Sequence, residues 1–156
     1  MKKQLIGCLI LSSVLLLAGC GEKNTDPYNW TDEEYIEKFL SYEQVIGYLP
    51  LSSGNVGITQ NGVNVLNSNA PSSVRLRTSY FDFPGYKEQV EVAQDIIITW
   101  EGFDTNYWTI KYGSDGYATY TPIFDVISEA LTVEAVATIE CGTCVKDVSY
   151  TFKVNV

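Results

Sequence analysis

Residues 131–156 read LTVEAVATIECGTCVKDVSYTFKVNV, and apolar and polar side chains alternate along nearly the whole stretch. Alternation with a period of two predicts two β-strands, each with one face in a core. Gly142-Thr143 separates the two halves and matches a two-residue type II′ turn, which takes Gly at its first central position. The stretch therefore predicts an antiparallel hairpin.

This turn also predicts the register of the hairpin. All the apolar pairs then share one face, and a shift of one residue would turn one strand inside out. The expected partners are Cys141–Cys144, Ala137–Val148, Ala135–Tyr150, Val133–Phe152 and Leu131–Val154.

Further short strands are predicted upstream of the hairpin. Asn61-Gly62 is a strong type I′ turn signal and predicts a hairpin between residues 56–60 and 63–66. Residues 96–100 form the most apolar strand candidate, which we expect to be central. The other candidates are 74–80, 90–92, 107–112 and 117–121, with 123–128 as a strand or a short crossover. This spacing of strands and turns predicts a mainly β fold, an antiparallel β-sandwich, over residues 51–156.

Part of this region also resembles a known class of domains. Residues 98–156 combine an apolar strand that ends in Trp100, a Gly/Asp turn, a Tyr-Thr-Pro segment and the final hairpin. In this they resemble bacterial immunoglobulin-like or PKD-like domains. The turn at residues 100–104 departs from the PKD form. The resemblance implies an immunoglobulin-like sandwich.

One helix is predicted before the β domain, over residues 31–46 of a segment that spans 31–50. Thr31 and Glu34 form a capping box, and acidic residues fill the first turn. Gly47 is the expected stop. The apolar face of the helix favours packing on the domain, and the alternative is a stalk or partner-binding helix. The apolar residues on that face are Tyr35, Ile36, Phe39, Leu40 and Ile46.

The N-terminus has the layout of a secretory signal. Two lysines precede an apolar run at residues 5–18, which is shorter than the ~20 residues that a membrane-spanning helix needs. The end of this run overlaps Leu17-Ala18-Gly19-Cys20, which resembles the lipobox of bacterial prolipoproteins. The resemblance implies removal of residues 1–19, a lipid on Cys20 that anchors the protein in a membrane, and a tether over 20–30. An ordinary cleaved signal is the alternative.

The same resemblance implies a location in the bacterial cell envelope, facing the periplasm or the cell surface. Gly21, rather than Asp, follows the lipidated cysteine, which favours the outer membrane if the host is Gram-negative.

Charge and composition narrow the function classes. Without residues 1–19 the chain has eight Lys and Arg against nineteen Asp and Glu, a formal net charge of −11. Such a charge argues against nucleic-acid binding. The chain has no histidine, which removes the commonest general base and metal ligand, and no cofactor motif is present. We therefore expect that the protein is not an enzyme and that it binds neither a metal ion nor a cofactor.

Two cysteines remain after Cys8 and Cys20 are assigned to the signal and the lipid. Cys141 and Cys144 flank the predicted turn, where a structural disulfide is favoured because both flanks read as strands. Thioredoxin-like redox chemistry would need a helix after the motif, and zinc would need more ligands. Thiols, redox activity and metal binding remain the alternatives.

Aromatic residues are concentrated between Trp100 and Tyr120. Most are expected in the core, and an outward set of Tyr107 with Tyr117 or Tyr120 could stack on sugars or form a protein hot spot. Asp104, Asp115 and Asp125 in adjacent loops could hold calcium, although the sequence lacks the spaced acidic motif of a calcium loop.

These features together predict a membrane-anchored, non-catalytic module that has a binding or structural role in the envelope. An inhibitor or immunity lipoprotein that blocks a protein partner is one alternative, and its acidic surface would fit a basic target. A glycan-binding surface lipoprotein is the other. A carboxylate-based hydrolase is disfavoured, since no Asp or Glu stands in a recognisable catalytic motif.

Overall fold

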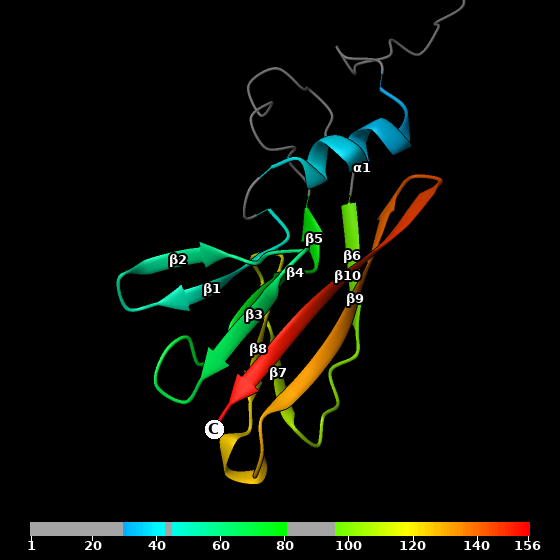
Figure 1. The fold of residues 1–156 in the computed structure, drawn as a ribbon. Coiled ribbons are helices and arrows are strands. Elements are labelled where there is room, and N and C mark those ends of the chain that lie inside the picture. The colour runs from blue at the N-terminus through cyan, green and yellow to red at the C-terminus, as the bar shows by residue number, and fades with distance from the viewer. Residues whose placement is uncertain (1–29, 43–44, 81–95) are drawn as a thin grey trace, which may run out of the picture.

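The computed structural model of the protein describes residues 30–42, 45–80 and 96–156. In this part the chain is mainly β, with one α-helix and two five-stranded sheets (Figure 1). The elements are α1 (Asp32–Leu40), β1 (Gly47–Leu51), β2 (Gly54–Gly57), β3 (Val63–Asn67), β4 (Val74–Arg77), β5 (Ser79–Tyr80), β6 (Ile96–Glu101), β7 (Trp108–Tyr112), β8 (Tyr117–Pro122), the 3-10 helix η1 (Phe124–Val126), β9 (Leu131–Cys141) and β10 (Cys144–Asn155).

The first sheet has the strand order β2-β1-β4-β8-β7, and every pairing in it is antiparallel. The second sheet has the order β3-β10-β9-β6-β5. β6 lies between β9 and β5, an internal position as expected for the most apolar strand.

The C-terminal hairpin has the predicted register. Cys144 pairs with Cys141, Val148 with Ala137, and the remaining pairs follow without a slip. Gly142 has a φ of 55°, as the first central position of the turn requires. The predicted alternation is confirmed, because the buried positions of both strands recur with a period of two and pair with one another, whereas Val136 and Val145 lie on the outward face.

The prediction of an all-antiparallel fold is wrong at one edge. β3 pairs with β10 in parallel, with Val63 opposite Thr151 and Leu66 opposite Val154. The second sheet is therefore mixed.

The hairpin predicted around Asn61-Gly62 is also wrong. β2 pairs with β1 in the first sheet, whereas β3 belongs to the second, so residues 58–62 cross between sheets. The buried Asn64 side chain holds this crossing. Its amide oxygen accepts from the Thr59 N–H at 2.7 Å, and its amide nitrogen donates to the carbonyls of Thr59 and Thr151 at 3.0 and 3.1 Å. These three bonds fasten the loop to β10.

The chain changes sheets again after β4. Residues 74–80, predicted as one strand, form β4 in the first sheet and β5 in the second. Thr78 lies at the switch, where its N–H donates to Gly116 and its carbonyl accepts from Ile98. Residues 123–128 contain η1, which leads from β8 to β9, and the strand predicted at 90–92 lies outside the described residues.

The inward faces of both sheets contribute to one core. Phe103, in the β6–β7 connection, lies between the sheets, with its ring 4.5 Å from Tyr120, 4.9 Å from Trp108 and 5.6 Å from Phe152. The alanines of β9, Ala135 and Ala137, are fully buried. They leave room for the larger side chains that face them.

The helix begins where the capping box predicts. Thr31 Oγ1 accepts from the Glu34 N–H, and Glu34 Oε2 accepts from the Thr31 N–H. Tyr35, Ile36 and Phe39 are fully buried, and α1 packs on β9 and β10 (Figure 1).

The helix ends at Leu40 rather than at residue 46. Gly47, the expected stop, is the first residue of β1, so residues 47–50 belong to the first sheet rather than to a helical segment. Ile46 matches the helical spacing, but it is buried on the way into β1. Gly47 is needed there because a Cβ would lie 2.7 Å from the Arg75 carbonyl of the paired strand.

The predicted signal, the predicted lipobox and most of the predicted tether fall on residues 1–29, outside the described residues. Among the residues that are described, no helix is both long and apolar enough to cross a membrane.

Candidate functional site

Cys141 and Cys144 face each other at the tip of the β9–β10 hairpin. They are direct cross-strand partners, with Cys141 buried and Cys144 half-buried. No disulfide bond joins them in the described part of the chain, and the disulfide between them stays a prediction. β10 continues directly after Cys144, so the helix that thioredoxin-like chemistry would need does not follow it.

The N-terminus of α1 is held against this tip. Asp32 Oδ2 accepts from the Thr143 N–H at 2.8 Å and from the Thr143 hydroxyl at 3.0 Å. Glu37, one turn further along α1, forms an ion pair with Lys146. The helix and the hairpin tip are therefore joined by polar contacts as well as by the buried face of α1.

The three aromatic residues predicted as an outward set do not form one surface. Tyr120 is 3% exposed and packs against Phe103 in the core. Tyr107 is 40% exposed and lies before β7, whereas Tyr117 is half-buried on the outward face of β8. Only Tyr117 takes part in a cluster of polar and aromatic side chains.

We call this group the Arg75 cluster: Tyr48, Arg75, Arg77, Asp115 and Tyr117. The Arg75 guanidinium lies over two rings, 5.6 Å from the centroid of Tyr48 and 5.1 Å from that of Tyr117. The two rings meet edge to face at 5.5 Å. Arg75 Nη2 also donates to Asp115 Oδ2 at 2.5 Å, and this bond lowers the pKa of the Asp115 carboxyl. The contacts hold Arg75 in one orientation.

Arg77 has a structural place in the same cluster. Its guanidinium lies 4.2 Å from the Tyr117 centroid and donates to the Tyr117 hydroxyl. Nε donates to the Val45 carbonyl at 2.8 Å, and the Arg77 carbonyl accepts from Trp100 Nε1 at 2.8 Å. Arg77 thus fastens the segment before β1 and the end of β6 to β4. With both guanidinium groups over it, the Tyr117 ring is poorly placed to stack on a sugar.

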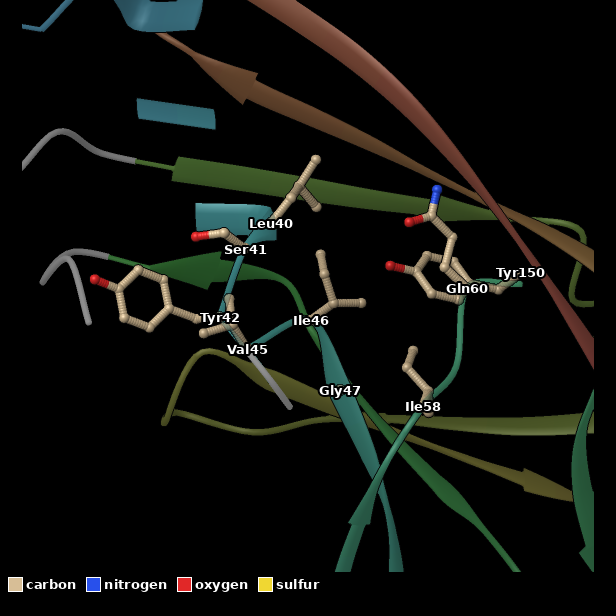
Figure 2. A pocket seen from close by; sticks show the side chains of 9 residues that line it. All are labelled: Leu40, Ser41, Tyr42, Val45, Ile46, Gly47, Ile58, Gln60 and Tyr150. Atoms are coloured by element: carbon tan, nitrogen blue, oxygen red, sulfur yellow. The ribbon is translucent and has the colours of Figure 1, made fainter. Parts of the chain in front are cut away.

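A small cavity lies between the end of α1, the start of β1 and β10 (Figure 2). Leu40 and Ile46 line one side of it, and Gln60 and Tyr150 line the other (Figure 2). Burial raises the pKa of Tyr150 to about 12. The cavity has a volume of about 230 Å³, below the ~300–1,000 Å³ typical of ligand pockets.

Two of the three loop aspartates, Asp115 and Asp104, have separate partners, and Asp125 is exposed in η1. Asp115 pairs with Arg75, and Asp104 accepts from the Asn106 N–H at 2.8 Å. The described residues contain no group of three or more acidic or cysteine side chains placed to hold a metal ion.

Sequence reasoning did not single out the Arg75 cluster. Tyr48 fell in the segment read as helix, so its pairing with Arg75 across β1 and β4 was not expected. One signal was present: Arg75 and Arg77 alternate with the buried Val74 and Leu76, which places both arginines on the outward face of one strand.

Comparisons with known proteins add no relative to this description. No protein-family model, curated protein or solved structure matches the chain at a significant level.

Proposed function

We propose that the protein is a lipid-anchored lipoprotein of the bacterial envelope whose folded part is a non-catalytic binding module. The observation that carries the proposal is Leu17-Ala18-Gly19-Cys20, placed at the end of a short apolar run that follows two lysines. Diacylglycerol on Cys20 Sγ, with a further acyl chain on the new amino terminus, would make the anchor durable, because one chain alone binds a membrane only marginally.

The strand order supports an immunoglobulin-like sandwich for the folded part. In an immunoglobulin domain, strands A, B, E and D form one sheet, and C, F and G form the other. The orders β1-β4-β8-β7 and β6-β9-β10 correspond to these two sheets in chain order as well as in space. Domains of this architecture commonly present their faces and loops to partners, which agrees with a binding role.

The contacts of α1 support a fixed attachment of the module to its tether. The helix starts at Asp32, and Asp32 binds the hairpin tip through Thr143. Ten residues separate Cys20 from Thr31, which span at most about 35 Å. The hairpin tip would then be the end of the domain nearest the membrane.

Membrane fractionation with intact-mass analysis tests the proposal. The extracted protein should lack residues 1–19 and should carry the mass of a diacylglycerol on Cys20, with or without an additional acyl chain. Cys20→Ser, which keeps the signal but removes the lipid acceptor, should abolish the acyl mass. A soluble protein, or one that retains residue 1, would overturn the proposal.

A protein inhibitor is the second candidate, and one observation favours it. The outward positions of the second sheet carry Glu101, Glu134, Glu140 and Asp147, a surface complementary to a basic partner. The helix is not a suitable plug for a partner, since its apolar face is already buried. Crosslinking on intact cells distinguishes the two candidates: repeated capture of a single basic protein would favour the inhibitor.

A further inference from the structure

Four segments that lie apart in the sequence meet at the cavity of Figure 2. They contribute Leu40 from the end of α1, Ile46 from the start of β1, Ile58 and Gln60 from the crossing between the sheets, and Tyr150 from β10. Hydrogen bonds hold the crossing in place. The Ile58 N–H donates to the Gly47 carbonyl at 3.2 Å, and the Asn64 amide bonds to the backbone of Thr59. The walls of the cavity are therefore fixed by the fold, as in most small-molecule sites.

The Tyr150 hydroxyl is a buried polar group that points into this cavity. Tyr150 is 4% exposed, and its ring packs on that of Trp100 at 5.5 Å. In Figure 2 the hydroxyl points toward Leu40 and Ile46. No group of the described residues forms a hydrogen bond with it, although buried tyrosine hydroxyls normally have a partner. This hydroxyl is available to a molecule bound in the cavity.

The lining favours a neutral molecule with one polar end. Because burial raises the pKa of Tyr150, its hydroxyl stays protonated at neutral pH and can donate a hydrogen bond. The Gln60 amide lies on the same side and offers a second donor and an acceptor (Figure 2). Leu40, Ile46 and Ile58 are apolar. None of the described lining residues is charged, so a bound ion would lose hydration without gaining an ion pair.

The volume limits the size of the molecule. A cavity of about 230 Å³ is too small for most drug-sized ligands. It is larger than the cavity of about 150 Å³ that holds one benzene molecule in another protein. One aromatic ring, or an aliphatic group of similar size, therefore fits together with a polar substituent.

We propose that this cavity binds a small neutral molecule about the size of a phenol, with its oxygen at Tyr150 and Gln60 and its apolar body against Leu40, Ile46 and Ile58. This deepens the proposed binding role and rests on it.

Titration of the full, detergent-extracted protein with p-cresol tests the proposal, with backbone amide NMR shifts as the readout. We expect saturable shifts centred on Gly47, Ile58 and Tyr150. Tyr150→Phe keeps the ring and should weaken p-cresol binding about fivefold, the effect of losing one neutral hydrogen bond. The same variant should leave toluene binding unchanged, because toluene has no oxygen. Each probe is compared between variants in one detergent, so its uptake by micelles cancels.

The matched control is Tyr112→Phe, which removes a hydroxyl from an exposed tyrosine of β7 and should bind both probes as the parent does. Gln60→Leu is a second variant. It replaces an exposed side chain, so we expect it to fold, and it should also weaken p-cresol binding.

Several results would overturn the proposal. An absence of saturable shifts would show that the cavity takes up water only. Equal p-cresol affinity in the parent and Tyr150→Phe, or an equal loss in Tyr112→Phe, would remove the role of Tyr150. Benzoate binding as tight as that of p-cresol would show an anionic ligand. Tighter binding of N-acetyltyrosinamide would assign the cavity to a tyrosine side chain of a protein partner. Intact mass is measured on the same preparation, so loss of the ligand is distinguished from loss of the lipid-anchored assignment.

Discussion

Asp32 and Thr143, 111 positions apart in the chain, are joined by two hydrogen bonds to one carboxylate oxygen, at 2.8 and 3.0 Å. The first turn of α1 is thereby fixed to the turn between β9 and β10. The contact also explains Gly142, because a Cβ at that position would collide with the Asp32 carboxylate. The position of α1 on the hairpin tip thus depends on Asp32, Gly142 and Thr143.

Removal of this contact should destabilise the domain. We expect Asp32→Ala to lower the free energy of unfolding by about 1–2 kcal/mol, since two hydrogen bonds to a charged group are lost at a partly exposed site. Glu33→Ala is the matched control, because Glu33 lies in the same first turn but is exposed. Urea denaturation of both variants measures the difference. Equal midpoints for the two variants would show that the Asp32–Thr143 contact contributes nothing.

Cys141 and Cys144 should form a disulfide in the envelope location that we propose, because thiol oxidants there would accept the two electrons and two protons that are released. Intact-mass analysis should show two hydrogen atoms gained on reduction. We expect Cys141→Ala/Cys144→Ala to change stability little, because a disulfide that closes so short a loop constrains the unfolded chain weakly. Alkylation of both cysteines without prior reduction would contradict the prediction.

Phe103 should be essential to the core although it lies in a connection. Its ring contacts residues of both sheets, so Phe103→Ala should lower the free energy of unfolding by about 3 kcal/mol through lost packing and a residual cavity. Tyr107→Ala, in the same connection but 40% exposed, serves as the control and should cost less than about 1 kcal/mol. Thermal and urea unfolding measure both. A larger loss of stability for Tyr107→Ala than for Phe103→Ala would contradict the assignment of Phe103 to the core.

Stability should fall steeply at alkaline pH. Burial raises the pKa of Tyr120 and Tyr150 from 10.0 to about 12. Between pH 10 and 12 the unfolded chain has lost protons that the folded chain keeps, so the stabilisation is complete below about pH 10 and is lost as pH rises. Each tyrosine should account for about 2–3 kcal/mol across that window.

Tyr120→Phe provides the control for this effect, because it removes one buried phenol and keeps the ring. Its stability should fall less between pH 10 and 12 than that of the parent, as measured by urea denaturation at each pH. An equal fall in both proteins would show that Tyr120 titrates in the folded state as it does in the unfolded chain.

The sequence by itself determined the elements that depend on neighbours in the chain. The β9–β10 hairpin is specified by alternation on both sides of a two-residue turn, and the start of α1 by the capping box of Thr31 and Glu34. In both cases the interacting residues are close in sequence, so turn geometry and side-chain period leave one arrangement. The predicted lipobox, which lies outside the described residues, is likewise a local pattern.

The tertiary structure alone decided which distant strands meet. Asn61-Gly62 has the local chemistry of a hairpin turn, yet Asn64 bonds to β10 and takes β3 into the other sheet. Tyr48 and Arg75 form a cluster only because β1 pairs with β4, and Tyr120 is buried because its side of β8 faces the core, where Phe103 packs on it. Such pairings depend on which faces fill the shared core. That is a property of the whole chain, and no local period encodes it.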